Sequence, residues 1–123
     1  MTGISKTRRA FDITTPAQEA ALASLDSPGE LDRRRSENAE GRAELERILG
    51  AHGLDCAGPA VANFLFAEVG EDSRPLFEQL LREGVIVRPT HGFGAPGAVR
   101  ITVGTPDEHE LLDEALSRVL ARA

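Results

Sequence analysis

Two arginines, Arg88 and Arg100, are the residues whose types and positions could do chemistry together. Arg88 ends a short apolar run at residues 85–87, and Arg100 lies within a second run at residues 98–103. Short β-branched runs bounded by glycine and proline are typical of strands. Guanidinium groups on two adjacent strands would form a fixed fork for a carboxylate or a phosphate. The sequence therefore predicts an anion-binding site built from Arg88 and Arg100.

The connection between these two runs contains a G-x-G-x-x-G match, formed by Gly92, Gly94 and Gly97. A dinucleotide-binding fingerprint needs a strand directly before it and a helix directly after it, because the pyrophosphate sits at the helix N-terminus. Here a strand follows, and Pro96 interrupts the turn. We interpret the segment as a flexible loop over a site.

Other common site chemistries find no support in the sequence. His52, Cys56 and His91 do not have the spacing of a zinc site, and no fourth ligand accompanies them. No serine stands in a recognisable nucleophile elbow, and no motif places a histidine as its base. We therefore expect neither a metal site nor a catalytic residue.

Composition is that of an ordinary globular chain. Its 123 residues are 41% hydrophobic and 28% charged, and the net charge of −6 argues against a nucleic-acid surface. No apolar run approaches the roughly 20 residues of a membrane span, and no signal-peptide pattern opens the sequence. Because Cys56 is the only cysteine, it has no partner for an internal disulfide. We expect a cytoplasmic protein with no membrane partner.

Three helix starts share one pattern, in which a hydroxyl residue precedes a proline at the first helical position. They are Thr15-Pro16, Ser27-Pro28 and Thr105-Pro106. They predict an alanine-rich helix to about residue 25, a long helix ended by Gly53, and a last helix. An amphipathic helix is predicted at residues 75–83. The apolar side of the last helix is predicted to be Leu111, Leu112, Ala115, Val119 and Leu120.

A third strand is predicted at residues 61–69, with Phe64 and Phe66 on one face and Leu65 on the other. The order of elements predicts an α+β fold, with a three-stranded mixed sheet covered by helices. Its core has the order βαββα and follows the long helix. We expect residues 61–87 to form a right-handed crossover between parallel neighbours, and the last strand to be antiparallel to the one before it.

Several stretches stand in a familiar order: AFDITTPAQEAALASL, ANFLF, VIVRP, GFG and VRITVGTPDEHELLDEAL. Their combination resembles the C-terminal part of class I/II pyridoxal-phosphate (PLP) aminotransferases, most of all the histidinol-phosphate branch. The resemblance implies the small-domain aminotransferase fold. It also implies a boundary, with residues 1–26 as a lead-in and short helix from the end of the large domain, and residues 27–123 as the small domain.

The resemblance implies roles for the two arginines as well. In this family, an arginine in the position of Arg100 binds the substrate's acidic group. In the histidinol-phosphate branch, the arginines in the positions of Arg88 and Arg100 are expected at the phosphate. The implied reaction is amino-group transfer between histidinol phosphate and 2-oxoglutarate in histidine biosynthesis, with PLP as cofactor and a homodimer as the complete enzyme.

The sequence departs from the family pattern in its cofactor machinery, which lies upstream in complete members. Ser5-Lys6 resembles the start of the cofactor-lysine motif, but residues 7–10 lack its glycines, and the chain has no tyrosine. We expect this chain alone neither to bind PLP nor to transaminate, and to need a large domain or a split-enzyme partner. The alternative is a stand-alone, non-catalytic module that binds a small anionic metabolite through the same arginines.

Overall fold

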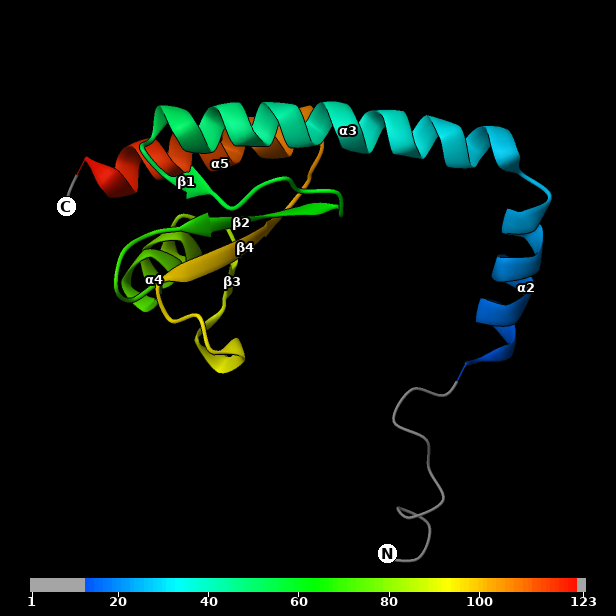
Figure 1. The fold of residues 1–123 in the computed structure, drawn as a ribbon, viewed down its shortest axis with the longest axis horizontal. Helices are drawn as coiled ribbons and strands as arrows, with labels where there is room; N and C mark the ends of the chain where they lie inside the picture. The colour runs from blue at the N-terminus through cyan, green and yellow to red at the C-terminus, as the bar shows by residue number, and fades with distance from the viewer. Residues whose placement is uncertain (1–12, 122–123) are drawn as a thin grey trace, which may run out of the picture. The chain divides into compact units, whose positions relative to one another are not determined.

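The computed structural model describes residues 13–121 and confirms an α+β fold (Figure 1). Four α-helices are described: α2 (Thr15–Leu25), α3 (Pro28–Ala51), α4 (Arg74–Arg82) and α5 (Pro106–Leu120). The strands are β1 (Asp55–Cys56), β2 (Phe64–Glu68), β3 (Arg88–Pro89) and β4 (Ala98–Thr102), and a 3₁₀ turn, η1, covers His91–Phe93. None of the helices in this part of the chain is long and apolar enough to cross a membrane.

Contacts divide the chain into two compact units, Met1–Arg35 and Ser36–Ala123. In the first unit, α2 has no buried residue. Its N-cap is Thr14 rather than the predicted Thr15, and the Thr14 side chain makes no capping hydrogen bond. The domain boundary predicted between residues 26 and 27 stays a prediction.

The sheet of the second unit has four strands in the order β1-β2-β4-β3, and every neighbouring pair is antiparallel. The predicted three-stranded mixed sheet is therefore wrong in strand number and direction. The added strand, β1, is only two residues long, pairing Asp55 with Glu68 and Cys56 with Ala67. Two residues are too few to show the alternation by which a strand is detected in sequence.

The predicted crossover between parallel neighbours is also wrong. Strands β2 and β3 run in the same direction, because each is antiparallel to β4, but β4 lies between them. The unit is a split βαβ arrangement, in which a later strand occupies the middle position. The prediction that the last strand is antiparallel to its predecessor is confirmed.

The strand predicted at residues 85–87 begins later in the chain than expected. Residues 85–87 are not paired in the sheet, and β3 consists of Arg88 and Pro89. The Val85 backbone N–H donates to Leu80 O at 2.9 Å, which closes the end of α4, and Val87 is buried. This apolar run therefore serves the helix end and the core before the chain reaches β4.

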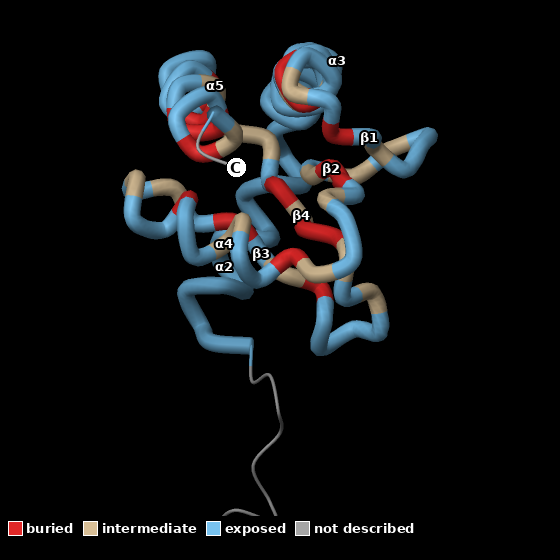
Figure 2. Tube along the Cα trace, turned by 90° about the vertical axis from the view of Figure 1, so that its left-hand side faces the viewer, coloured by how far each residue is buried: buried red, intermediate tan, exposed pale blue. Residues whose placement is uncertain are grey.

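The hydrophobic core lies between one face of the sheet and the helices α3 and α5, where Figure 2 shows most of the buried residues. Leu65 and Ala67 of β2 and Val99 and Ile101 of β4 supply the sheet side. The helices contribute Leu45, Ile48, Leu49, Leu112, Ala115, Leu116 and Val119, and α4 adds Leu80.

The predicted apolar side of α5 is partly wrong. Leu112, Ala115 and Val119 are buried as expected, but Leu111 is 58% exposed. Leu116 and the polar His109 are buried instead. The helix begins as predicted, because Thr105 and Glu108 form a reciprocal capping box.

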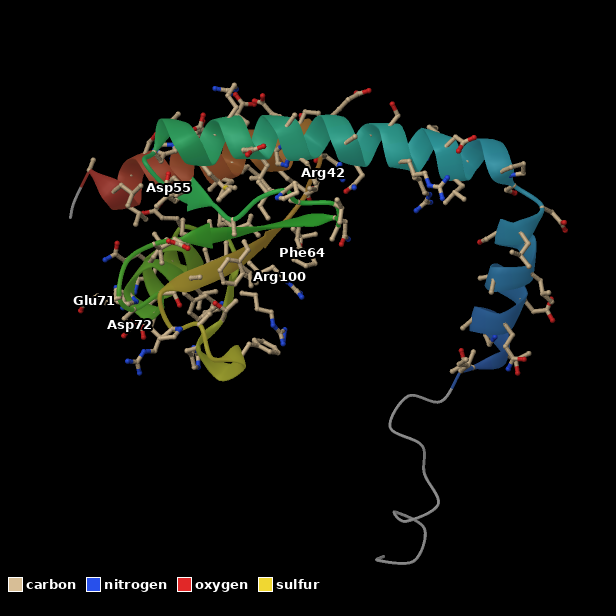
Figure 3. All side chains as sticks on the ribbon, viewed as in Figure 1. Arg42, Asp55, Phe64, Glu71, Asp72 and Arg100 are labelled. Atoms are coloured by element: carbon tan, nitrogen blue, oxygen red, sulfur yellow. The ribbon has the colours of Figure 1, made fainter. Side chains whose placement is uncertain are left out.

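The opposite face of the sheet carries the alternate residues of the strands. Phe64 and Phe66 of β2 and Arg100 of β4 are each partly exposed, whereas the residues that alternate with them within the strands, Leu65, Ala67, Val99 and Ile101, are buried. Successive side chains of a strand point to opposite faces. The fold thus uses one face of the sheet for the core under α3 and α5 and leaves Arg100 on the other face (Figure 3).

Candidate anion-binding site

The register of the sheet brings the two predicted arginines together. Arg88 of β3 and Arg100 of β4 are direct Cα partners in the antiparallel pair. Side chains of directly paired residues lie on the same face, at the closest cross-strand spacing. The predicted placement on adjacent strands is therefore confirmed, although the strand that carries Arg88 is shorter than expected.

Both arginines line a hollow of about 550 Å³. Its wall comes from α4, from the segment of β3 and η1, and from β4. The lining residues are Phe77, Ile86, Val87, Arg88, Pro89, His91, Gly92, Phe93, Arg100 and Thr102. A concave, largely apolar wall with a few cationic groups is a common form of small-molecule site.

Neither Arg88 nor Arg100 forms an ion pair with a carboxylate among residues 13–121. Other arginines do, and examples are Arg47 with Glu44 and Arg74 with Asp72. In an acidic chain, two cations on one sheet face without an acidic partner leave their positive charge available to a ligand. That ligand would be an anion.

Each of the two arginines has an aromatic partner instead. The Arg100 guanidinium carbon lies 5.0 Å from the centroid of the Phe64 ring, and the Arg88 carbon lies 5.7 Å from that of Phe93. Figure 3 shows Phe64 and Arg100 close together on the side of the sheet away from α3. Cation–π contacts of this kind contribute about 0.5–2 kcal/mol, and they orient a guanidinium without neutralising it.

The Nε atom of Arg100 is buried and has no hydrogen-bond partner among the described residues. A buried charged donor without an acceptor is costly, because it has lost its contact with water. The guanidinium of Arg100 is therefore only partly satisfied within the chain. An anion that accepts from its remaining N–H groups would relieve part of this cost.

Thr90 holds the segment that carries Phe93 in place. Its buried hydroxyl lies 2.7 Å from Ala95 O and 2.8 Å from Ala98 O, and so its single proton is shared between them. Its carbonyl accepts from the backbone N–H groups of Phe93 and Ala95 at 2.9 and 3.2 Å. Thr90 thus fixes η1 beside Arg88.

The glycine-rich segment is not a dinucleotide fingerprint, because β4 follows it rather than a helix. The loop, which the sequence predicts to be flexible, is held by backbone hydrogen bonds at its C-terminal end, near Pro96 and Gly97. Ser73 N–H donates to Pro96 O at 2.8 Å, and Val69 N–H donates to Gly97 O at 2.9 Å. Of the loop, only η1 contributes to the hollow.

The histidines and the cysteine do not come together. No cluster of three or more possible metal ligands exists in the part of the chain that the structure describes. His52, which directly follows α3, lies 2.6 Å from Asp113 of α5, and His91 lines the hollow. Burial raises the pKa of the Cys56 thiol, which makes it a poor nucleophile.

Sequence reasoning found the two arginines but missed the residues that hold them. Phe64 was placed on the correct face, yet nothing in the sequence said which residue of the other strands it would meet. Phe93 stands out in the sequence only as part of GFG, and no motif marks Thr90. A hydroxyl residue after the short strand and before a glycine-rich turn is the signal that could have drawn attention to Thr90.

The fold of the second unit, a short antiparallel sheet backed by α3 and α5, was compared with known protein families. The sequence profile of the family described as aminotransferase class I and II matches residues 2–119. The chain belongs to the class I and II aminotransferase family.

Individual relatives give a narrower comparison. The histidinol-phosphate aminotransferase 2 of Pseudomonas fluorescens is 39% identical over 123 residues, covering 98% of this chain and 32% of the relative. That of Pseudomonas aeruginosa is 38% identical over 118 residues, covering 96% and 32%. The crystal structure of aspartate aminotransferase from Thermotoga maritima superposes with a TM-score of 0.66 at 31% identity, covering 89% of this chain and 28% of that one. The chain spans about a third of the length of the curated relatives that it matches.

Complete members of the family use PLP, which is held as a Schiff base on a lysine. The only lysine of the sequence, Lys6, lies outside the described residues. Residues 13–121 contain neither a lysine nor a tyrosine, and so they do not fit the cofactor.

Proposed function

We propose that this chain supplies the C-terminal, substrate-binding domain of a PLP-dependent aminotransferase of the histidinol-phosphate type. The reaction would be amino-group transfer between histidinol phosphate and 2-oxoglutarate in histidine biosynthesis. Residues 27–123 would form the small domain, while the cofactor and its lysine would lie on a large domain or on a split-enzyme partner. The complete enzyme would be a homodimer.

The observation that supports this proposal is the direct pairing of Arg88 with Arg100 on the open sheet face. Both guanidinium groups border one hollow, and neither has an acidic partner within residues 13–121. A phosphate monoester or a carboxylate can accept from two such groups at once. In the proposed role, Arg100 binds the substrate anion and Arg88 assists.

The test is a chimera in which residues 1–123 replace the matching segment of the Pseudomonas fluorescens histidinol-phosphate aminotransferase 2. We expect the chimera to transaminate histidinol phosphate. Arg100→Ala should then lower kcat/KM by about 30- to 1,000-fold, because losing one charge-assisted contact to the substrate costs about 2–4 kcal/mol. Arg82→Ala, at an exposed position of α4, is the matched control and should change kcat/KM by less than about 2-fold.

The outcomes separate the two functions that the sequence left open. An active chimera whose kcat/KM is insensitive to Arg100→Ala would remove the proposed role of Arg100. An inactive but folded chimera, together with anion binding by the isolated chain, would favour the stand-alone module. Absorbance near 420 nm that develops with PLP only in the chimera would place the Schiff-base lysine outside this chain.

A further inference from the structure

Phe64 occupies an unusual place relative to Arg100. The Cα partner of Arg100 on β2 is Phe66, whereas Phe64 pairs with Thr102. Nevertheless the ring under the Arg100 guanidinium is that of Phe64. The side chain of Arg100 therefore runs diagonally across the strands, a spacing that long side chains and aromatic rings can bridge.

The surroundings of Arg100 restrict how it can meet a ligand. Its Nε atom is buried without a hydrogen-bond partner among the described residues, and the ring of Phe64 covers the guanidinium. Arg100 lines the hollow, but Phe64 does not. Phe64 thus contacts the arginine from outside the hollow, and the terminal Nη groups of Arg100 remain as its accessible donors.

We propose that Phe64 is the positioning residue of Arg100. Its ring holds the guanidinium in one orientation, so that the terminal N–H groups are presented end-on to an anion in the hollow. Affinity then rises because the arginine loses little conformational freedom on binding. This inference rests on the proposed anion-binding role of Arg100, and it assigns to Phe64 a role that requires no contact with the ligand.

The second arginine provides an internal contrast. Phe93, which lies at 5.7 Å from Arg88, is itself 72% exposed, and Arg88 is exposed as well. An exposed pair gains less from a cation–π contact than a desolvated one. Orientation by an aromatic ring should therefore matter more for Arg100 than for Arg88.

The experiment uses the full chain, labelled with ¹⁵N at arginine, and inorganic phosphate as the probe. Phosphate binding is followed by NMR through the arginine Nε–Hε signals. Phe64→Leu should weaken phosphate affinity by about 3- to 10-fold, while Phe64→Tyr, which keeps an aromatic face, should stay within about 2-fold of the wild type. Phe66→Leu, a matched change on the same strand and face, should also stay within about 2-fold.

Thermal unfolding of the same variants separates positioning from a general loss of structure. A merely structural role predicts that Phe64→Leu and Phe66→Leu weaken binding in proportion to their loss of stability. The positioning role predicts weaker binding in Phe64→Leu alone. Equal phosphate affinity in Phe64→Leu and the wild type would overturn the positioning role and leave the anion site standing.

A measurement on the unmodified chain keeps the proposal testable if Phe64→Leu fails to fold. In the wild type, the Arg100 Hε proton should exchange with water more slowly than that of the exposed Arg82 and should be displaced upfield by the Phe64 ring. An Hε of ordinary shift and exchange rate would overturn the positioning role. Absence of any phosphate-dependent change at Arg88 and Arg100 would instead overturn the anion site itself.

Discussion

At the scale of single residues, the ion pair between Asp72 and Arg74 shows how hydrogen bonds can favour the ionised form of a carboxylate on the surface. Arg74 donates from its side chain to both carboxylate oxygens, at 2.7 to 3.0 Å, and from its backbone N–H to Oδ1 at 3.0 Å. These hydrogen bonds, the side-chain ones first, lower the pKa of Asp72 from 3.8 to about 2. The ionised form is therefore favoured by folding.

The sign of the resulting pH dependence follows from that lowered pKa. Because the folded pKa of Asp72 lies below its ordinary value, its contribution to stability is complete above about pH 4. It is lost as the pH falls from about 4 through 2. A ¹³C NMR titration of the Asp72 carboxyl should give a midpoint near 2, and Arg74→Ala should return it toward 3.8. An unchanged midpoint in Arg74→Ala would contradict the assigned cause.

At the residue scale, the sequence predicts that Arg88 and Arg100 lie on adjacent strands, but it does not predict the residues that contact them. Arg88 and Arg100 were found because an arginine in or beside an apolar, β-branched run is chemically conspicuous. The contacts that Phe64 and Phe93 make with these arginines could not be predicted, because a phenylalanine in such a run is indistinguishable from a core residue. Which ring meets which guanidinium depends on cross-strand register, and a single sequence does not contain it.

At the scale of elements, the turns around the sheet are fixed by close backbone approach. At Gly97, an added Cβ would meet the carbonyl oxygen of Gly70 far inside contact distance. The Gly97 carbonyl also accepts from Val69 N–H at 2.9 Å. The segment before β4 therefore packs directly on the turn that follows β2, and a side chain cannot be accommodated without moving one of them.

Gly97→Ala should lower the free energy of unfolding by about 1–3 kcal/mol, the range observed for overpacking at rigid sites. Gly92→Ala is the matched control in the same glycine-rich segment, where an added Cβ meets nothing within 4 Å. It should change stability by less than about 0.5 kcal/mol. Chemical denaturation of both variants would check this, and equal stabilities would show that the two turns are not in rigid contact.

Helix starts and ends were the most predictable elements, because capping chemistry is local. Gly53 adopts a positive φ of 71° just after α3, and the capping box of Thr105 opens α5 as expected. Strand order was the least predictable, because it depends on contacts between distant segments. The run at residues 85–87 has the composition of a strand, yet Val85 closes α4, Val87 is buried in the core and Ile86 is exposed.

At the scale of the whole molecule, the two compact units should differ in local stability. Helix α2 has no buried residue, and a helix of 11 residues is marginal in water without tertiary packing. Helix α5 buries five residues in the core. Hydrogen exchange followed by mass spectrometry should show α2 amides exchanging at least about 100-fold faster than those of α5. Comparable protection in both helices would mean that α2 is covered in solution.

The central place of β4 has a consequence for how a growing chain reaches this fold. Neither β1–β2 nor β3 has its main partner until residues 98–102 leave the ribosome, since β4 joins the two halves of the sheet. The arginine fork is completed in the same event, because Arg88 meets Arg100 only across that last strand. A nascent polypeptide stalled before Ala98 would carry Arg88 without Arg100, and so it would lack the pair of arginines on which the proposed anion site depends.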